Sequence, residues 1–282
     1  KGIVYGSIAH INMVLSILKF SRLISNKVII RESSIPSLRN KKSHTLKRLV
    51  CWFVYRYCMK SVDLIIVQSK AMQADLVSIF KIPCSKIKLI RNPVVSDFKL
   101  RHHERTLTIA NDCENYFFIG RLEEEKGSER LLELASKLGE SEILHIIGSG
   151  SQLKVINDYV DKMFLGDRVK VYGYIPNPIS NISLQQRGRL IILSDYEGFP
   201  NVALEAMLQN WSIFAVEACS GLNDWEEFSE IVKFSPTVDN MLTKLRTATT
   251  ANKVYEEQKS QILNLHSFNT NLENLCDSIF NE

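Results

Sequence analysis

Residues 190–209 combine three local patterns that constrain the fold more than any other stretch of the chain. Four apolar residues, Leu190 to Leu193, have the length and composition of a buried parallel strand. A loop with Gly198 and Pro200 follows, and from Asn201 onward apolar residues return at helical spacings of three and four. We expect Asn201 to cap this helix, whose first N–H groups are then free to bind an anion.

Two carboxylates flank this loop with seven residues between them, Glu197 in the loop and Glu205 in the helix. An isolated pair at this spacing would indicate only two solvated glutamates. The surrounding residues, Glu-Gly-Phe-Pro-Asn and then Glu-Ala-Met, closely resemble the Glu-x7-Glu motif of the retaining GT-B glycosyltransferases of family 4. The resemblance implies that Glu197 is catalytic, near the hydroxyl groups of a donor sugar, and that Glu205 binds a nucleotide ribose. It also implies that donor phosphate or sugar contacts the turn formed by Gly198, Phe199, Pro200, Asn201 and Val202.

A second charged loop follows another predicted strand. Residues 120–127 read Gly-Arg-Leu-Glu-Glu-Glu-Lys-Gly after the apolar run 116–119. They match the donor-diphosphate loop of the same family, which implies that Gly120 lies at the donor and that Arg121 and Lys126 contact the phosphates. Two fixed cations would stabilise the negative charge on a departing nucleoside diphosphate. An ordinary surface loop is the alternative, because three acidic residues separate the two cations.

Two further turns extend the predicted donor site. Gly148, Ser149 and Gly150 follow a predicted strand and resemble the family's second glycine loop, which passes close to the donor. A Gly-x-Gly sequence by itself would indicate only a tight turn. Tyr174 follows the next predicted strand, where family members place the nucleobase, so we assign it to the donor site by position alone.

The composition predicts a folded chain and gives no sign of nucleic-acid binding, a zinc site or a dense disulfide framework. The 282 residues are 45% hydrophobic and 23% charged with a net charge of +4, so charge alone implies no nucleic acid. The six cysteines form no Cys-x2-Cys pair, which argues against a zinc site and fits a reducing cytoplasm. No Asp-x-Asp occurs, so we expect no bound divalent metal. The resemblance implies no cofactor, with a UDP- or GDP-linked sugar as the donor substrate.

The first half of the chain resembles the family more loosely. His10 follows a predicted buried strand at 3–6, and Arg31 and Glu32 follow a predicted strand at 27–30. Open α/β sheets bind ligands at this end of their strands. The family often has an Arg-Glu pair here, which implies that these three residues line an acceptor cleft. A surface ion pair for Arg31 and Glu32, and a helix-start position for His10, are the alternatives.

Residues 39–58 join a basic cluster to an aromatic-rich segment. Residues 49–55 read Leu-Val-Cys-Trp-Phe-Val-Tyr, and directly before them lie Arg39, Lys41, Lys42, His44, Lys47 and Arg48. Such a segment can lie on an anionic membrane surface through its positive charge and aromatic rings. A core helix behind a solvated loop is the alternative, and the apolar residues on nearly every side of 49–55 favour it.

Repeated strand–loop–helix units with long connections predict right-handed parallel α/β structure. We expect two Rossmann-like domains that face each other across a cleft, the GT-B arrangement of the resembled family. The predicted divisions are a partial acceptor-side domain (1–95), a linker (96–113), a nucleotide-sugar-binding domain (114–262) and a C-terminal helix packing back toward the first domain (263–282). The first domain looks truncated, because family members carry a further strand and glycine loop upstream.

The resemblance implies a retaining glycosyltransferase that transfers a sugar from a nucleotide sugar to a glycan or polyprenyl-linked glycan acceptor. We expect it to serve bacterial surface polysaccharide synthesis (O-antigen or capsule), in the cytoplasm or at the inner face of the cytoplasmic membrane. Two alternatives are open. One is a non-catalytic nucleotide-sugar-binding fragment, and the other is a different GT-B enzyme such as a nucleotide-sugar 2-epimerase or a phosphorylase.

Overall fold

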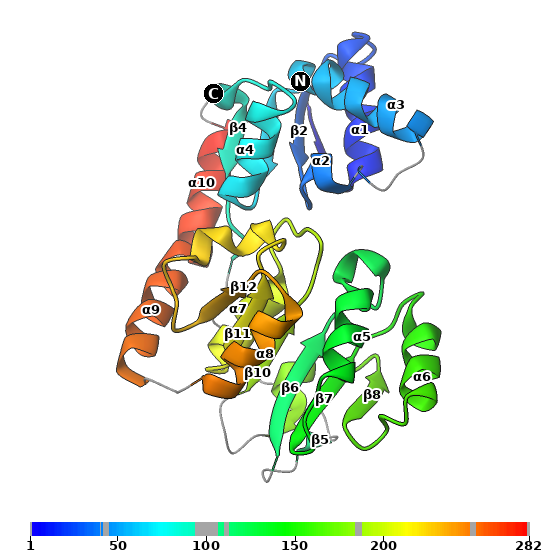
Figure 1. The fold of residues 1–282 in the computed structure, drawn as a ribbon. Helices are drawn as coiled ribbons and strands as arrows, with labels where there is room; N and C mark the ends of the chain where they lie inside the picture. Colours follow the sequence, from blue (N-terminus) through cyan, green and yellow to red (C-terminus); the bar gives the residue numbers. More distant parts are fainter. Residues whose placement is uncertain are drawn as a thin grey trace.

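The computed structural model describes residues 2–39, 41, 45–93, 107–109, 113–183, 188–248 and 252–280. Their strands form two main parallel sheets, which belong to two lobes of the molecule. Figure 1 shows the first lobe at the top, in blue and cyan, and the second lobe below it, in green to orange. The α/β class expected from the sequence is therefore confirmed.

The first lobe contains a four-stranded parallel sheet in the order β1-β2-β3-β4. Its strands are β1 (Ile3–Gly6), β2 (Lys27–Arg31), β3 (Leu64–Val67) and β4 (Ile87–Leu89). Its helices are α1 (Ala9–Phe20), α2 (Pro36–Arg39), α3 (Thr45–Arg56) and α4 (Lys70–Ser78), with 3-10 turns η1 (Cys58–Ser61) and η2 (Cys84–Lys86). Helical segments separate the strands because parallel neighbours need crossover connections.

Both faces of β2 are buried, which explains its uninterrupted apolar run. Val28 and Ile30 belong to a core cluster that includes Tyr55 of α3 and Leu76 of α4. Ile29 belongs to a second, smaller cluster of the same sheet. That cluster also contains Leu64, Ile66 and Ile90, with Leu275 and Ile279 of the helix α10 (Phe268–Phe280) packed against it.

Two expectations about burial in the first lobe are wrong. Ile3 and Tyr5 of β1 are 44% and 51% exposed, because β1 is an edge strand whose only described partner is β2. The helix expected to lie in the core, α3, buries only Cys51, Val54 and Tyr55. The exposed apolar residues of this segment, called the α3 face below, are Leu46, Leu49, Val50, Trp52, Phe53 and Tyr57. None of the described helices has the length and apolarity needed to cross a membrane.

The second lobe contains a six-stranded parallel sheet in the order β12-β11-β10-β6-β7-β8. Its strands are β6 (Glu114–Ile119), β7 (Glu142–Ile147), β8 (Val169–Gly173), β10 (Arg189–Ile192), β11 (Ser212–Val216) and β12 (Val232–Ser235), and a separate parallel pair joins β5 (Leu107–Thr108) to β9 (Ile182–Ser183). Its helices are α5 (Ser128–Ser136), α6 (Leu153–Lys162), α7 (Asn201–Leu208) and α8 (Val238–Thr247), with 3-10 turns η3 (Glu124–Lys126), η4 (Pro178–Asn181) and η5 (Ser220–Trp225).

The strand order of the second sheet reverses at β6. From β6 the chain adds β7 and β8 on one side, and then returns to add β10, β11 and β12 on the other. A crevice therefore forms at the carboxyl ends of β6 and β10, where open α/β sheets bind ligands.

The described chain ends with two helices that return to the first lobe. α9 (Asn252–Leu265) lies beside the second lobe, and α10 continues upward along the first (Figure 1). The predicted linker 96–113 lies mainly outside the described residues. The domain limits therefore stay a prediction.

Candidate functional site

The strand–loop–helix unit expected at 190–209 is present as β10, a loop and α7. The prediction that Asn201 caps the helix is wrong, because Asn201 is the first residue of α7 and Pro200, with extended backbone, precedes it. No side chain caps this helix end. The Asn201 side chain accepts a hydrogen bond from Asn92 of the first lobe instead.

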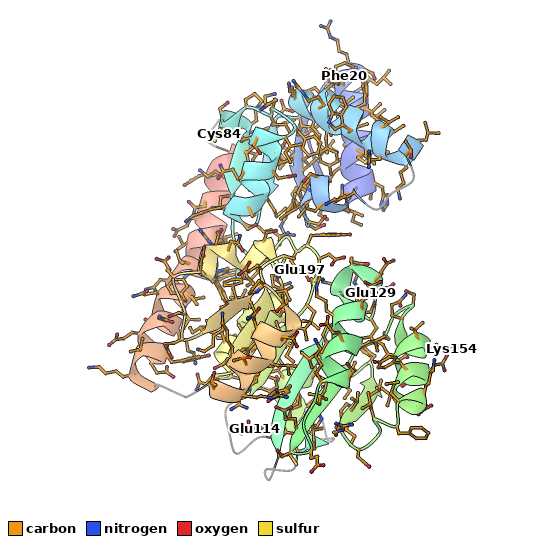
Figure 2. The ribbon with its side chains drawn as sticks, in the orientation of Figure 1. Phe20, Cys84, Glu114, Glu129, Lys154 and Glu197 are labelled. Carbon is orange, nitrogen blue, oxygen red and sulfur yellow. The ribbon has the colours of Figure 1, made fainter. Side chains whose placement is uncertain are left out.

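A cavity of about 270 Å³ lies at the carboxyl ends of β6 and β10. Figure 2 shows Glu197, one of its lining residues, between the two lobes. The cavity brings together several residues that the sequence assigns to the donor, Gly120, Lys126, Glu197, Phe199, Pro200, Asn201 and Val202. The rest of its wall consists of strand ends and Ser194, with Phe118 and Ile119 from β6 and Ile191, Ile192 and Leu193 from β10 and its loop.

Opposite charges meet inside this cavity. The Lys126 ammonium donates to Glu197 Oε1, and both side chains are largely shielded from solvent, with exposed fractions of 21% and 13%. Ser194 Oγ donates to the same oxygen at 2.8 Å. Glu197 Oε1 therefore accepts from two donors, and any anionic ligand that binds Lys126 competes with Glu197 for it.

The backbone fixes the loop that carries Lys126 against the end of β10. The Asp195 N–H donates to the Glu125 carbonyl at 2.9 Å, and Arg130 Nη1 donates to the Leu193 carbonyl at 3.0 Å. Gly127 has φ +81°, and a Cβ there would lie 2.1 Å from the Leu193 carbonyl oxygen. Only glycine permits this approach, which positions Lys126 beside Glu197.

The two glycine loops of the second lobe pack backbone to backbone. A Cβ on Gly148 would lie 1.8 Å from the Gly120 carbonyl oxygen, and a Cβ on Gly150 would lie 2.3 Å from that of Leu122. The Leu122 N–H donates to the Ser149 carbonyl at 2.9 Å, which joins the loops directly. The glycines therefore allow two strand ends to approach closely beside the cavity.

The chain matches a known protein family over the residues that form this site. The sequence model of the family described as glycosyl transferases group 1 matches residues 102–250, more than half of the chain. The chain belongs to this family.

Several characterised and uncharacterised proteins resemble this chain. The N-acetylgalactosamine-N,N'-diacetylbacillosaminyl-diphospho-undecaprenol 4-alpha-N-acetylgalactosaminyltransferase of Campylobacter jejuni is 24% identical over 249 residues, 86% of this chain and 66% of that protein. The lipopolysaccharide 1,6-galactosyltransferase of Escherichia coli is 27% identical over 140 residues, 48% of this chain and 37% of that protein. The chain spans 43% and 39% of the length of two uncharacterized glycosyltransferases of Methanocaldococcus jannaschii.

Solved structures share the fold of this chain. Sucrose-phosphate synthase from Thermosynechococcus elongatus has a TM-score of 0.76 at 17% identity, covering 99% of this chain and 74% of that one. Anabaena Alr3699/HepE in complex with UDP has a TM-score of 0.73 at 14% identity, covering 100% of this chain and 79% of that one. These likenesses confirm the expected GT-B architecture of two Rossmann-like units.

The remaining residues assigned to the donor lie outside the cavity wall. Arg121 is 69% exposed in its side chain and pairs with Glu125 at 3.2 Å, and Tyr174 is 74% exposed. Ser149 is also exposed. A Cβ on Gly198 would lie 2.4 Å from the Ser33 carbonyl oxygen of the first lobe, so the loop meets the other lobe at Gly198. The roles of these residues stay predictions.

Glu205 has an unusual environment for a carboxylate. It is half-buried in α7, and burial raises the pKa of its carboxyl. No hydrogen bond or ion pair to it is found within the described part of the chain. A partly desolvated acceptor without a partner has free capacity for donor groups on a ligand.

The residues expected to line an acceptor cleft are dispersed. His10 is exposed in the first turn of α1. Arg31 Nη2 donates to Asn92 Oδ1 at 2.6 Å, so it takes part in the junction between the lobes. Glu32 does not line a cleft, because it is 0% exposed and accepts hydrogen bonds from Asn12 and Tyr55. Glu32 directly follows the buried strand β2, and its two partners, Asn12 of α1 and Tyr55 of α3, enclose it.

Sequence reasoning missed four residues around the site. Ser194 and Arg130 hold Glu197 and its loop, but a serine after a strand and an arginine on a helix carry no specific signal. Asp224 of η5 accepts from Arg91 Nη2 at 3.0 Å and from the Lys70 N–H at 3.1 Å, both in the first lobe. Asn92 lies in the Arg-Asn-Pro sequence 91–93 just beyond β4, and no local pattern there indicates a contact with the second lobe.

Proposed function

We propose that this chain is the donor-binding and catalytic part of a retaining glycosyltransferase that uses a nucleotide sugar. The observation that carries the proposal is the cavity at the β6–β10 crevice, which combines a paired Lys126 and Glu197 with the first residues of α7. A cation, a helix N-terminus and a carboxylate in one shielded space suit a ligand with both phosphate and hydroxyl groups. The donor sugar and acceptor classes named from the sequence are part of this proposal.

In the proposed reaction, the bond between the anomeric carbon and the diphosphate breaks, and its electron pair leaves with the diphosphate. Lys126 then stabilises the added negative charge, and the exposed Arg121 is long enough to join it from the same loop. The acceptor hydroxyl oxygen forms the new bond on the same face of the sugar, and its proton passes to the oxygen of the departing diphosphate that received the electron pair. Lys126 acts by being fixed, beside Glu197, before the charge develops.

Glu197 has two effects in this scheme. It attracts Lys126, and it lies where positive charge would develop on the sugar ring as the bond breaks. Glu205, with its unpartnered and partly buried carboxylate, accepts from the ribose hydroxyls. Ribose contacts change little during the reaction, so Glu205 stabilises the bound donor and the transition state equally and contributes to donor affinity. Glu197 contributes mainly to turnover.

The test is calorimetric titration of UDP and GDP, together with kinetics of sugar transfer, in Glu205→Gln and Glu197→Gln. Glu205→Gln should weaken binding of the nucleoside diphosphate by roughly ten- to a hundredfold, the loss expected for charge-assisted hydrogen bonds. Glu197→Gln should bind it as tightly as the wild type or more tightly, since Lys126 no longer has a competing carboxylate, while turnover falls. Glu133→Gln, a surface change on α5, is the control.

Equal weakening of diphosphate binding in both variants would contradict the division of roles. Absence of binding of either diphosphate to the wild-type chain would overturn the proposed function itself.

We also propose that the α3 face contacts an anionic membrane that carries the acceptor. Six exposed apolar side chains lie on a segment that also contains Lys47, Arg48 and Arg56. Aromatic rings and basic groups on one helix are typical of a peripheral membrane contact. The polyprenyl-linked acceptor named from the sequence would be reached at such a surface.

Co-sedimentation with vesicles of phosphatidylcholine and phosphatidylserine tests this contact. Neutralising Lys47 and Arg48 to Gln should weaken binding by roughly thirtyfold at low salt, on about 1 kcal/mol per basic residue near anionic lipid. Lys154→Gln with Lys162→Gln removes the same charge from α6 of the second lobe and should change nothing. Vesicle binding that is equally insensitive to both double variants and to salt would contradict a charge-dependent contact through the α3 face.

A further inference from the structure

The chain passes between the lobes after β4 and again between α9 and α10. A hydrogen bond between Asn92 and His266 joins these two passages. Asn92 lies just beyond β4, and His266 lies between α9 and α10. His266 Nδ1 is 2.6 Å from the Asn92 carbonyl oxygen. Both residues are buried, at 6% and 0% exposure, so this hydrogen bond is shielded from water.

The protonation of His266 follows from its partners. The Trp225 indole N–H can only donate, and it lies 3.2 Å from His266 Nε2, which must therefore accept. Nδ1 then carries the proton and donates to Asn92. Burial lowers the pKa of His266 to about 4, so the ring stays neutral in this tautomer at neutral pH.

The same ring contacts the loop between β10 and α7, called the donor loop below. The His266 ring centroid is 4.9 Å from that of Phe199, and Trp225 packs edge-on against Phe199 at 5.3 Å. Phe199 belongs to the cavity wall. His266, at the point where the chain returns to the first lobe, therefore packs directly against the loop that carries Glu197.

The Asn92 side chain continues this connection with a fixed direction. The Arg31 guanidinium can only donate, so Asn92 Oδ1 accepts from it at 2.6 Å. Asn92 Nδ2 therefore donates, and its acceptor is Asn201 Oδ1. The Asn201 oxygen is thereby occupied. Its NH2 group ends this series of hydrogen bonds and has no partner among the described residues.

The geometry points to Asn92 as a positioning residue for donor binding: held by Arg31 and His266, it orients the Asn201 amide so that an NH2 donor serves the cavity. Arg31 and Asn92 belong to the first lobe and Asn201 to the second, so the orientation is set only when the lobes are together. Donor binding and lobe closure are thereby coupled. This inference rests on the proposed function and adds to it the residues that link the donor loop to the junction.

The experiment compares Asn92→Asp, Asn92→Ala and His266→Phe with a matched control, His145→Phe. His145 is also buried, hydrogen-bonded through both ring nitrogens and stacked on a phenylalanine, but it lies within the second sheet. Asn92→Asp keeps the oxygen for Arg31 but replaces the donor to Asn201, whose amide must then reverse. His266→Phe keeps the ring packing and removes both hydrogen bonds.

Calorimetry with UDP or GDP, whichever the wild type binds, and small-angle X-ray scattering with and without that nucleotide provide the readouts. Both Asn92 variants should bind roughly tenfold more weakly, the effect of about one hydrogen bond to a charged ligand, and should compact less on nucleotide addition. His266→Phe should change both readouts in the same direction. His145→Phe should lower the melting temperature without changing either.

Wild-type affinity and wild-type compaction in both Asn92 variants would overturn the inference while leaving the proposed function intact. A loss of affinity in His145→Phe as large as in His266→Phe would also overturn it, because the effect would then follow stability alone. If the wild type binds no nucleoside diphosphate, the proposed function and this inference fall together.

Discussion

Two buried histidines behave as neutral hydrogen-bonding groups rather than as charges. His145 lies between Tyr172 Oη at 2.9 Å and Asn115 Oδ1 at 2.8 Å, and His266 lies between Trp225 and Asn92. Burial lowers the pKa of each imidazole to about 4, from an ordinary value of 6.5. The native chain therefore resists protonation at sites where the unfolded chain accepts it.

We expect acid to destabilise the protein well above the pH at which its carboxylates titrate. Between pH 6.5 and about 4 the unfolded chain binds protons that the native chain excludes, so stability is present above this window and falls as the pH drops through it. Each histidine should cost roughly 2 kcal/mol between pH 7 and pH 5. Urea unfolding at both pH values checks this, and His145→Gln, which does not titrate, should reduce the difference. A pH effect unchanged in that variant would contradict the assignment to His145.

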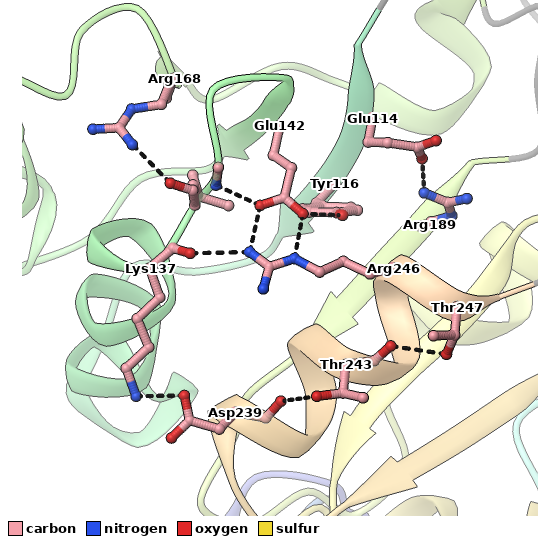
Figure 3. Close-up of polar contacts among 12 residues, drawn as sticks. Glu114, Tyr116, Lys137, Glu142, Arg168, Arg189, Asp239, Thr243, Arg246 and Thr247 are labelled. Carbon is pink, nitrogen blue, oxygen red and sulfur yellow. Dashed lines mark hydrogen bonds and ion pairs between the residues drawn. The ribbon is translucent and has the colours of Figure 1, made fainter.

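At the scale of elements, one carboxylate ties helix α8 to the second sheet. Arg246 of α8 donates to both oxygens of Glu142 at the start of β7, at 2.7 and 2.8 Å (Figure 3). Tyr116 and the Gly139 N–H complete the set of donors to Glu142. The hydrogen bonds from Arg246 lower the pKa of Glu142 to about 2 against the effect of its burial. This network lies at the opposite end of the strands from the cavity.

Removing this tie should reduce stability and leave the site unchanged. Glu142→Gln should lower the free energy of unfolding by about 1.5–3 kcal/mol, the usual range for hydrogen bonds to a charged group. Because the folded pKa of Glu142 is depressed, its contribution is present above about pH 4.5 and is lost toward pH 2. Urea unfolding at pH 7 measures the loss, with Glu133→Gln in an exposed ion pair as the control. Equal losses in the two variants would show that the network around Glu142 adds nothing.

At the scale of the whole molecule, the lobes touch through backbone as well as side chains. Gly198 faces the Ser33 carbonyl so closely that a Cβ would lie 2.4 Å from its oxygen. Nearby, Asp224 of η5 accepts from Arg91 and from the first N–H of α4. The lobes are thus held together at a glycine and a buried carboxylate next to the donor loop.

Gly198→Ala should therefore separate the lobes without unfolding either. Gly198 has no left-handed backbone, so the methyl group is strained only by the opposite lobe. We expect a larger radius of gyration by small-angle scattering and a melting temperature close to that of the wild type. Gly166→Ala, where a Cβ would meet nothing within 4 Å, is the control for the added methyl group. An unchanged radius in Gly198→Ala would show that the loop yields instead of the lobes.

The strands of this molecule were predictable because apolar runs bounded by turn residues carry a local signal. The runs 27–30, 190–193 and 116–119 fall within one or two residues of β2, β10 and β6. The grouping of Lys126 with Glu197 followed from family resemblance. The bonds of Asn92, His266 and Asp224 could not be predicted, because they depend on how two lobes meet, which no periodicity encodes. The exposure of the α3 face was missed because an apolar composition does not reveal which elements cover it.

The helix α10 makes the first lobe discontinuous in chain order. Its residues Leu275 and Ile279 cover the cluster of Ile29, Leu64 and Ile66, yet they are synthesised after every strand of the second sheet. On the ribosome, the second lobe can complete its core while one face of the first sheet is still open to water. A nascent chain halted before α10 would present that apolar face to chaperones, and the second lobe is the part we expect to mature first.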